Sequence, residues 1–369
     1  LQQQARTLAQ ESIAPRAAHW DETEDYPWEN VEKLVSAGFM GMTIPTHLGG
    51  PGRSLMDAVL VIEEMAKVCG ITGRIVVEGN MGALGILLRY GSPELQQTFA
   101  PYVLQGDKPV IAISEPDAGS DATAMQTRAE LRGDEIVLSG QKCWITGGGI
   151  SRINVVFARI LENGEDQGIG AVLVEKDTPG FRVGRRAYMM GLRGLPESEL
   201  HLENCRVPRG HLLAVGFRKL MEAYNAQRVG AGTVALGVAQ GAFELALAFA
   251  KERHQFGRAI GSFQGLRWML ADARMELDAA RLLLHRAATC VDPRTGYPDK
   301  DFAALAKVKA SEMAIKVTND ALQIFGARGY SRDFPLERMA RDARMFTIGG
   351  GTAQALRNVI GDGLLGKPR

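Results

Sequence analysis

The sequence predicts an α+β protein of three parts: an N-terminal helical domain over residues 1–110, a middle antiparallel β-domain over 111–212, and a C-terminal helical bundle over 213–369. Apolar residues recur at three- and four-residue spacing up to about residue 105 and again after about residue 213. The stretch between consists of short runs rich in Val and Ile, separated by Gly, Asp, Asn and Pro. A chain of 369 residues is also too long for one simple core, so several compact units are expected.

Helical spacing predicts the α-elements of the first and last parts. In the first part, helices are expected over residues 1–18, 28–37 and 54–68. The segment 41–55 carries prolines and glycines and interrupts them as a loop. In the last part, helices are expected over residues 217–252, 262–290, 301–326 and 335–364.

Short β-branched runs predict the middle part. Strands are expected over residues 109–114, 135–140, 153–160, 168–177, 181–186 and 199–207. Turn-forming residues separate these runs, which is typical of a small antiparallel β-domain. The order is therefore α, then β, then an α-bundle.

The composition excludes several classes of function. Lys and Arg together number 43 against 42 Asp and Glu, so a nucleic-acid or membrane partner is not expected. The most apolar stretch, residues 229–243, is shorter than the roughly 20 residues that cross a bilayer. The first residues form a polar amphipathic helix rather than a signal peptide.

Cysteine and histidine usage argues against a metal site. The four cysteines form no C-x-x-C pair and have no histidine nearby, and the six histidines are isolated. We therefore expect no bound metal, no disulfide framework and a location in the reducing cytoplasm. The cysteines are Cys69, Cys143, Cys205 and Cys290.

The commonest nucleotide-binding motifs are missing. No G-x-G-x-x-G follows a strand and opens a helix, and no G-x-x-x-x-G-K-[ST] occurs. The glycine clusters at residues 147–150 and 349–352 have neither context. A nucleotide, if bound, must therefore be held by another kind of site.

Two segments of the middle part carry groups suited to a flavin. Residues 113–121, Ile-Ser-Glu-Pro-Asp-Ala-Gly-Ser-Asp, place small residues and hydroxyls after a strand, where backbone N–H groups can meet a flavin edge or a pyrophosphate. An ordinary turn is the alternative. Residues 142–148, Lys-Cys-Trp-Ile-Thr-Gly-Gly, set the flat ring of Trp144 beside the hydroxyl of Thr146. A lone Trp at a strand end is more often part of the core, but the two segments together favour a cofactor site.

These segments resemble the E-P-x-A-G-S-D and K-x-W-I-T-x-G signatures of the acyl-CoA dehydrogenases. The resemblance continues through residues 253–257 with Gln264, then 323–326, 341–344 and 351–354, and it covers essentially the whole chain in the family's order. It implies a C-terminal four-helix bundle that builds dimers or tetramers, an FAD cofactor, and an acyl-CoA thioester substrate.

The resemblance also assigns residues to the cofactor. Flavin contacts are implied for Ile113, Ser114, Gly119, Ser120, Trp144, Ile145 and Thr146. Contacts to FAD, partly across a subunit interface, are implied for Arg253, Phe256, Gln264, Gln323 and Gly326. Thr352 and Gln354 are expected to close over the cofactor. Ala327 stands where relatives have a second Gly, and it is left out of this set.

Substrate contacts are implied for Arg74, Ser120, Asn225, Gln227 and Arg228. Asn225 and Arg228 resemble the family's contacts to the nucleotide end of coenzyme A, where a cation meets phosphates. Surface ion pairing is the alternative for that pair.

The family's catalytic base is missing from both of its usual positions. Acyl-CoA dehydrogenases remove the α-proton with a carboxylate while the β-hydrogen leaves as hydride to flavin N5. The base usually occupies the second place of Tyr-Glu-Gly-Thr, where this sequence has Gly350. Isovaleryl-CoA dehydrogenases carry it just before an Arg on the helix after the β-domain, where this sequence has Gln227. Neither residue can take a proton.

The missing base leaves three possibilities open. The chain is a non-catalytic FAD- or acyl-CoA-binding paralogue, or it is a dehydrogenase whose base has moved to Glu78, or it does not dehydrogenate at all. The alternative to a catalytic role for Glu78 is that of a solvated or Arg-paired helix residue. The third possibility rests on Arg74, Gln227 and Gly-Gly-Gly-Thr at 349–352, which resemble the 3-sulfinopropanoyl-CoA desulfinases, a small branch of the family. Those enzymes release sulfite from 3-sulfinopropanoyl-CoA and leave propionyl-CoA.

Physical chemistry favours a reaction other than dehydrogenation. A guanidinium binds a two-oxygen anion such as a sulfinate in a bidentate fork. An Arg74 guanidinium in the acyl pocket would be costly to bury without an anionic partner, and a fatty acyl chain offers none. The alternative is an Arg74 on an exposed helix face, paired with Glu78 four positions on. With the resemblance, this leads us to expect Arg74 and Gln227 as the catalytic residues, the Gln227 amide positioning a water or the thioester end.

Overall fold

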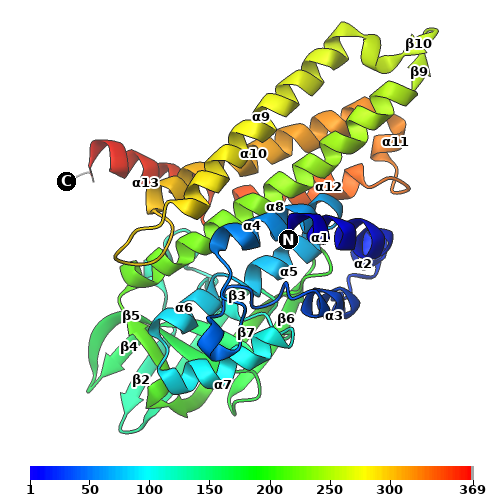
Figure 1. Cartoon of the computed structure of the whole chain (residues 1–369). Coiled ribbons are helices and arrows are strands. Elements are labelled where there is room, and N and C mark those ends of the chain that lie inside the picture. The colour runs from blue at the N-terminus through cyan, green and yellow to red at the C-terminus, as the bar shows by residue number, and fades with distance from the viewer. Residues whose placement is uncertain (367–369) are drawn as a thin grey trace.

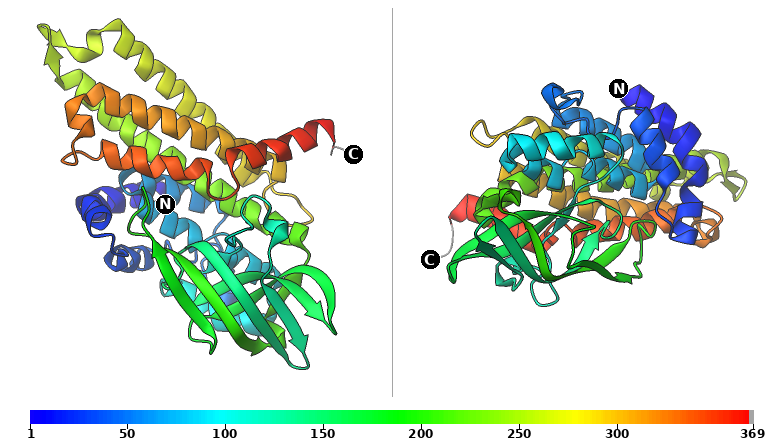
Figure 2. Two further views of the ribbon diagram at one scale, coloured as in Figure 1. Left: turned by 180° about the vertical axis from the view of Figure 1, so that it is seen from behind. Right: turned by 90° about the horizontal axis from the view of Figure 1, so that it is seen from below.

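Helix α8 (Phe217–Glu252) runs through most of the length of the molecule and connects its two ends. The computed structural model describes residues 1–366. A β-sheet lies at one end, the N-terminal helices pack along the middle of α8, and the C-terminal helices project beyond them (Figure 1). Figure 2 shows, from behind and from below, that the helices cover one face of the sheet. The predicted α–β–α order is confirmed.

The N-terminal part is helical as predicted, with one interruption near its start. Its helices are α1 (Gln2–Leu8), α2 (Ala17–Thr23), α3 (Trp28–Ser36), α4 (Leu55–Val68), α5 (Gly70–Glu78), α6 (Ala83–Tyr90) and α7 (Pro93–Leu104). The predicted helix over 1–18 is broken by a π-turn at Ala9–Ile13 and a 3₁₀ turn at Ala14–Arg16. Pro15 has no N–H to continue the ladder, which accounts for the change. Ser54 caps the N-terminus of α4: its Oγ accepts from Asp57 N (3.1 Å) while Asp57 Oδ2 accepts from Ser54 N (3.0 Å).

The middle part is an 8-stranded sheet in the order β6-β7-β3-β2-β4-β5-β8, with β1 paired to β4. Its strands are β1 (Val110–Ala112), β2 (Arg128–Arg132), β3 (Glu135–Thr146), β4 (Ile153–Glu162), β5 (Glu165–Glu175), β6 (Phe181–Ala187), β7 (Glu197–Pro208) and β8 (Leu212–Val215). The predicted antiparallel pairing holds for most of the sheet. It is wrong at β1 and β2, which both pair with β4 in parallel. The chain reverses from β2 into β3 and again into β4, which then lies beside β2 in the same direction.

The C-terminal part is the predicted helical bundle, with a break that the sequence pattern concealed. After α8 come a small hairpin of β9 (His254–Gln255) and β10 (Arg258–Ala259), then α9 (Gln264–Thr289), α10 (Lys300–Phe325), α11 (Ala327–Tyr330), α12 (Leu336–Arg344) and α13 (Ala353–Leu365). The helix predicted over 335–364 is two helices. Gly350 (φ 75°) and Gly351 (φ 94°) adopt left-handed conformations between them, which an α-helix cannot include.

The core is continuous between the N-terminal helices and the bundle. Apolar side chains of α4 and α5 pack against the small residues of α8, so the helices approach closely. Two stretches of the described chain, Gly70–Tyr90 and Phe217–Glu252, are long and apolar enough to cross a membrane. Most of each apolar window is buried inside the fold, as in the core helices of a globular protein.

Candidate active site

The two flavin motifs of the sequence are joined by a buried ion pair. Lys142 Nζ, fully buried on β3, lies 2.7 Å from Glu115 Oε1 and donates to Ile113 O at 3.0 Å. Glu115 also accepts from the backbone N–H groups of Gln126 and Thr127. Burial lowers the pKa of Lys142 to about 8, against the opposing effect of Glu115. The pair therefore fixes the 113–121 loop against the strand that carries Trp144.

Trp144 is presented to the surface by an irregularity in β3. The register between β3 and β7 shifts between Lys142 and Ile145, and Trp144 adopts a left-handed conformation (φ 56°). Such a bulge re-aims a side chain, and strained non-Gly residues gather at functional sites. Trp144 is 62% exposed, so the flat face expected to stack on a flavin is open.

The second set of predicted FAD contacts lies at the opposite end of the molecule from the sheet. Arg253 caps the C-terminus of α8, Phe256 lies in the β9–β10 hairpin, and Gln264 opens α9. Gln323 and Gly326 end α10 nearby. Figure 1 shows this tip of the bundle far from β3 and β7. Phe256 is 92% exposed. One chain therefore does not bring the two halves of the predicted flavin site together.

Arg74 sits in a largely buried ion-pair group rather than on an exposed helix face. Its Nε is 3.1 Å from Glu78 Oε1, one turn along α5, and its side chain is only 11% exposed. The pairing considered from the sequence is thus confirmed, while the exposed helix face is wrong. The second oxygen of Glu78 is paired with Lys108, whose side chain is fully buried. Both oxygens of the proposed alternative base are therefore engaged by cations.

Lys108 reaches Glu78 past a glycine of the second flavin motif. A Cβ at Gly147 would collide with Lys108 Nζ, and Gly147 has a left-handed φ of 79°. No larger residue fits there without moving the ammonium group. The end of β3 therefore packs closely against the ion-pair group of Lys108, Glu78 and Arg74.

A second carboxyl group faces the flavin strand. Glu197 pairs in register with Thr146 across β3 and β7, and its Oε1 accepts from Thr146 Oγ1 at 2.6 Å. Burial raises the pKa of Glu197 to about 7, although the Thr146 hydroxyl, Arg74 and Lys108 act in the opposite direction. This carboxyl group stays protonated in an appreciable fraction of molecules near neutral pH.

Helix α8 contributes the remaining predicted substrate residues. The Gln227 side chain is buried, and a Cβ at Gly82 would collide with its Oε1. Arg228 Nη1 donates to Asn225 Oδ1 (2.8 Å), and its guanidinium lies 5.6 Å from the centre of the Tyr224 ring. Burial lowers the pKa of Arg228. A surface ion pair therefore does not fit the environment of Arg228, and its contact with the nucleotide end of coenzyme A stays a prediction.

Lys307 on α10 occupies the neighbourhood of the missing base. Its Nζ donates to Gly351 O at 2.6 Å, and a Cβ at Gly350 would lie 4.0 Å from its Cε. Burial lowers the pKa of Lys307 to about 7, with further contributions from Arg228 and Arg74. Arg228 and Arg74 are thus both close enough to Lys307 for their charges to act on it.

Three side-chain atoms in this group are buried without a hydrogen-bond partner among the described residues. They are Arg74 Nε, Gln227 Oε1 and Arg228 Nε. The Arg74–Glu78 contact is close enough for an ion pair, but the N–H direction does not make a hydrogen bond. Buried polar groups without partners are costly in a protein that has no ligand for them. All three belong to predicted substrate residues: an anionic ligand would satisfy the two guanidinium N–H groups, whereas Gln227 Oε1 needs a donor such as a water.

We expect Lys307→Met to abolish a pH-dependent component of stability. The folded-state pKa of Lys307 is depressed from 10.5 to about 7, so the unfolded chain binds more protons between these values and stability rises with pH across that window. At ~1.4 kcal/mol per pKa unit, the full window corresponds to roughly 4–5 kcal/mol. Denaturant unfolding of both proteins at pH 7 and pH 10 measures it. Parallel changes in the two proteins would contradict this assignment.

Comparison with known proteins agrees with the motifs. The family models of the N-terminal, middle and C-terminal domains of acyl-CoA dehydrogenases match residues 1–107, 110–205 and 214–365. Together they span nearly all of the chain. The chain belongs to the acyl-CoA dehydrogenase family.

Individual members of the family are close in sequence and structure. The chain is 56% identical to the 3-sulfinopropanoyl-CoA desulfinase of Paraburkholderia xenovorans, over 100% of this chain and 95% of that protein. It is 55% identical to the 3-sulfinopropanoyl-CoA desulfinase of Variovorax paradoxus, over 99% and 94% of the two chains. A glutaryl-CoA dehydrogenase from Mycobacterium smegmatis, solved in complex with FADH2, superposes with a TM-score of 0.93 at 26% identity, covering 100% of this chain and 94% of that one. The predicted acyl-CoA dehydrogenase fold is confirmed.

The residues present fit the FAD that the acyl-CoA dehydrogenase family carries. Trp144 offers an exposed aromatic face, Thr146 a hydroxyl, and the 113–121 loop backbone N–H groups held in place by Glu115. Thr352, at the start of α13, uses its Oγ1 to accept from Ala355 N (3.0 Å), and Gln354 follows it. Ser114 and Ser120 supply further hydroxyls.

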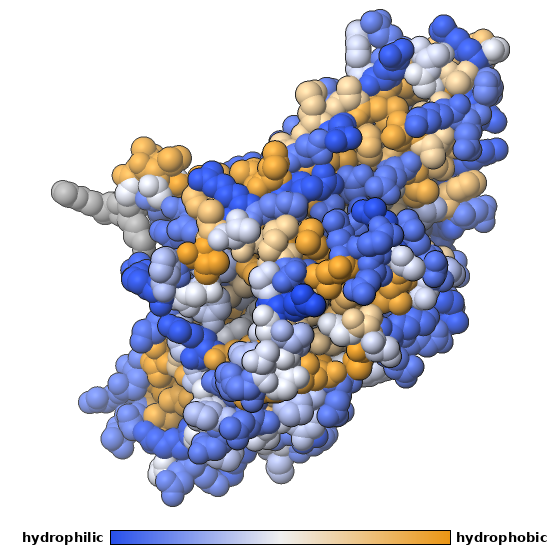
Figure 3. Space-filling view, viewed as in Figure 1, coloured by the Kyte–Doolittle hydropathy of each residue, from blue (hydrophilic) through white to orange (hydrophobic). Residues whose placement is uncertain are grey.

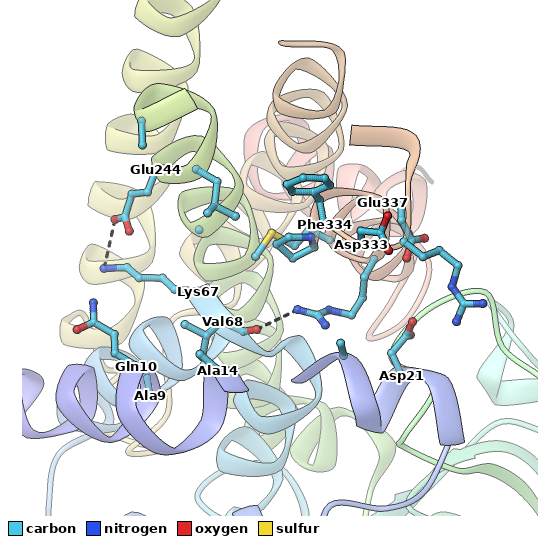
Figure 4. Close-up of a pocket in the computed structure, with 18 of the residues that line it drawn as sticks. Ala9, Gln10, Ala14, Asp21, Lys67, Val68, Glu244, Asp333, Phe334 and Glu337 are labelled. Atoms are coloured by element: carbon cyan, nitrogen blue, oxygen red, sulfur yellow. Dashed lines mark hydrogen bonds and ion pairs between the residues drawn. The ribbon is translucent and has the colours of Figure 1, made fainter. Parts of the chain in front are cut away.

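A separate cavity of about 460 Å³ lies between the N-terminal helices, α8 and the segment before α12 (Figure 4). None of the predicted flavin or substrate residues is among the described residues that line it. Lys67 Nζ lies 3.8 Å from Glu244 Oε1, and Arg338 Nη2 donates to Val68 O at 3.4 Å. Because these charged groups already have partners, the cavity differs from the acyl-CoA dehydrogenase site described above.

Sequence reasoning missed three residues of the site: Lys108, Glu197 and Lys307. Lys307 carried a usable signal, since it recurs with Ala303, Ala310 and Ala314 on the buried face of α10. A lysine on a core face requires a partner or a function. Lys108 and Glu197 carried none, because their importance depends on contacts between segments distant in sequence.

Proposed function

We propose that this chain is an FAD-containing desulfinase that converts 3-sulfinopropanoyl-CoA and water to propionyl-CoA and sulfite. One observation carries the proposal: a largely buried arginine, Arg74, with an unsatisfied Nε stands in a site whose two usual base positions hold Gly350 and Gln227. The relatives from Paraburkholderia xenovorans and Variovorax paradoxus, named for this activity, are more than half identical over nearly their full length.

The cationic group matches a substrate with a charged acyl tail. The charges of Arg74 and Arg228 both act on Lys307, and Glu78 is paired with Arg74 and Lys108. A guanidinium can hold the two sulfinate oxygens in one plane. We assign this role to Arg74 and the positioning of the thioester end or a water to the Gln227 amide. The flavin, when bound, supplies the family's electron-accepting ring beside the acyl chain.

A relocated-base dehydrogenase and a non-catalytic paralogue are less well supported. A dehydrogenase that uses Glu78 as base needs a free carboxylate oxygen, yet both oxygens of Glu78 are held by cations. A non-catalytic paralogue would have no need for three unsatisfied polar atoms at the acyl end of the site. Both of these functions predict that no sulfite is formed.

A homo-oligomer, a dimer or a tetramer, is part of the proposal. Arg253, Phe256 and Gln323 lie at the far tip of the bundle, so they would reach the flavin of a partner subunit. Apolar side chains also reach the surface over the bundle and at α13 (Figure 3). An exposed stripe recurs every seven residues along α9, formed by Trp268, Met275 and Leu282. Such a stripe suits helix packing between protomers.

A cytoplasmic location belongs to the same proposal. The four cysteines are free thiols in the described chain, and three of them are buried. A reducing compartment suits this usage.

Purified protein with 3-sulfinopropanoyl-CoA is expected to release one sulfite and one propionyl-CoA per substrate, with about one FAD per chain. Sulfite is measured colorimetrically and propionyl-CoA by mass spectrometry, alongside the flavin spectrum. Reduction of the flavin by the substrate without sulfite release would favour a dehydrogenase. No flavin and no rise in melting temperature on adding FAD would contradict the assignment as a whole.

A further inference from the structure

Glu197 is an acid that neither the family motifs nor the base positions account for. It lies on β7 opposite Thr146, and its Oε1 is 2.6 Å from the Thr146 hydroxyl oxygen. It therefore faces the end of β3 that carries the flavin motif. It is close enough to Arg74, Glu78 and Lys108 for their charges to act on it.

Two neighbouring carboxyl groups in this site have opposite environments. Glu78 has a cation on each oxygen, Arg74 on one side and Lys108 on the other. Glu197 has only the neutral Thr146 hydroxyl as hydrogen-bond partner among the described residues. Pairs of carboxyl groups in contrasting environments are how enzymes obtain an anion and an acid in one site.

Resting on the proposed function, we infer that Glu197 is the acid that donates the proton replacing the sulfinate group on the terminal acyl carbon. Arg74 would hold the sulfinate, and because Arg74 is close enough to act on Glu197, the carbon–sulfur bond would come near this carboxyl group. The chemistry requires such a donor, because a hydrogen takes the place of the sulfur.

The step balances without an oxidant. The carbon–sulfur bond breaks and its electron pair stays with carbon, which takes the Glu197 proton, while sulfur leaves as sulfur dioxide. Water adds to sulfur dioxide to give bisulfite and one proton, and that proton restores Glu197. The sum is sulfinate plus water to propionyl-CoA plus bisulfite.

The flanking strands place the uncharged Thr146 of β3 and Ala187 of β6 opposite Glu197, and the charged and titratable groups near it come from three other segments. Arg74 and Glu78 lie on α5, Lys108 precedes β1, and Tyr224 lies on α8. Burial is the largest influence and raises the pKa of Glu197 to about 7. The Glu197 carboxyl group thus carries its proton below this pKa and loses it above.

Glu197→Gln tests the inference, because the amide still accepts from Thr146 but has no acidic proton. We expect sulfite release to fall by about 10²–10⁴-fold, the usual effect of removing a general acid. In the wild type the rate should decline as pH rises through about 7, and the variant's residual rate should lack this decline. Glu197→Asp should recover part of the rate together with the decline. Glu199→Gln, two residues along β7, is the matched control and should behave as wild type.

Two measurements do not depend on turnover. Succinyl-CoA, in which a carboxylate replaces the sulfinate, should bind the wild type and Glu197→Gln equally by calorimetry. Because the folded-state pKa of Glu197 is raised from 4.5, the wild type should lose melting temperature relative to Glu197→Gln as pH rises from about 4.5 to 7.

The possible failures are distinct. No sulfite from the wild type would overturn the proposed function and this inference with it. Wild-type sulfite release matched by Glu197→Gln, with the same decline above pH 7, would overturn the inference alone.

Discussion

Replacing Arg74 by lysine is expected to lower sulfite release from 3-sulfinopropanoyl-CoA by roughly 30- to 4000-fold. Lysine keeps the charge and can still pair with Glu78, but it loses the planar fork that holds two oxygens at once. Loss of one buried charged partner costs ~2–5 kcal/mol, at about 1.4 kcal/mol per tenfold change. Steady-state sulfite release and the flavin content of the same preparation measure the effect.

Arg281→Lys is the matched control for Arg74→Lys. Arg281 on α9 also meets a buried carboxylate, with its Nη2 3.0 Å from Glu63 Oε1, but it lies outside the site. Arg281→Lys should change stability while leaving sulfite release near normal. If Arg74→Lys turned over like the wild type, the sulfinate-binding role of Arg74 would be wrong, and its pairing with Glu78 would be purely structural.

Gln227→Glu is expected to let butyryl-CoA reduce the flavin about 10²–10⁴-fold faster than the wild type does. The change is isosteric and restores a carboxylate at one of the family's two base positions. A rate effect of about 10²–10⁴-fold is usual for a general base. In the wild type, butyryl-CoA should bleach the flavin very slowly. Anaerobic stopped-flow absorbance follows the reduction directly.

Two further variants frame the Gln227→Glu result. Gln240→Glu makes the same change farther along α8, where Gln240 bonds to Arg281 and Glu244, and it should have no effect on bleaching. Gly350→Glu restores the other base position but forces a side chain into a left-handed conformation, at about 1–2 kcal/mol. Fast bleaching of the wild type by butyryl-CoA would reveal a base elsewhere, and Glu78→Gln would identify or exclude that residue.

The order of the domains and the flavin motifs were predictable from the sequence. Helical periodicity located α4, α8, α9 and α10 within a few residues, because each buries one apolar face over many turns. The sequence assigned the two middle-domain motifs to one cofactor site, and the structure adds the Glu115–Lys142 contact that holds them together. The spacing of apolar residues was sufficient to predict the long helices, because an α-helix repeats the same local geometry along its length.

Features that depend on long-range contacts were not predictable. The parallel pairing of β1 and β2 with β4 follows from the path of the chain, which a strand's own residues do not record. The break at Gly350 and Gly351 was hidden because apolar spacing continues across it. Glu78, the partner of Arg74, is also paired with Lys108, which approaches from another segment past Gly147.

Helix α8 fixes the distance between the two ends of the molecule. Gln227 and Arg253 are carried on one unbroken helix, about 39 Å apart at 1.5 Å per residue. In the proposed oligomer, a rigid helix of this kind would set the distance between the acyl pocket of one subunit and the contacts predicted to reach its neighbour's flavin. Insertions in α8 should therefore be rejected by evolution even at solvent-facing positions, and substitutions at its two ends should covary although the side chains never meet.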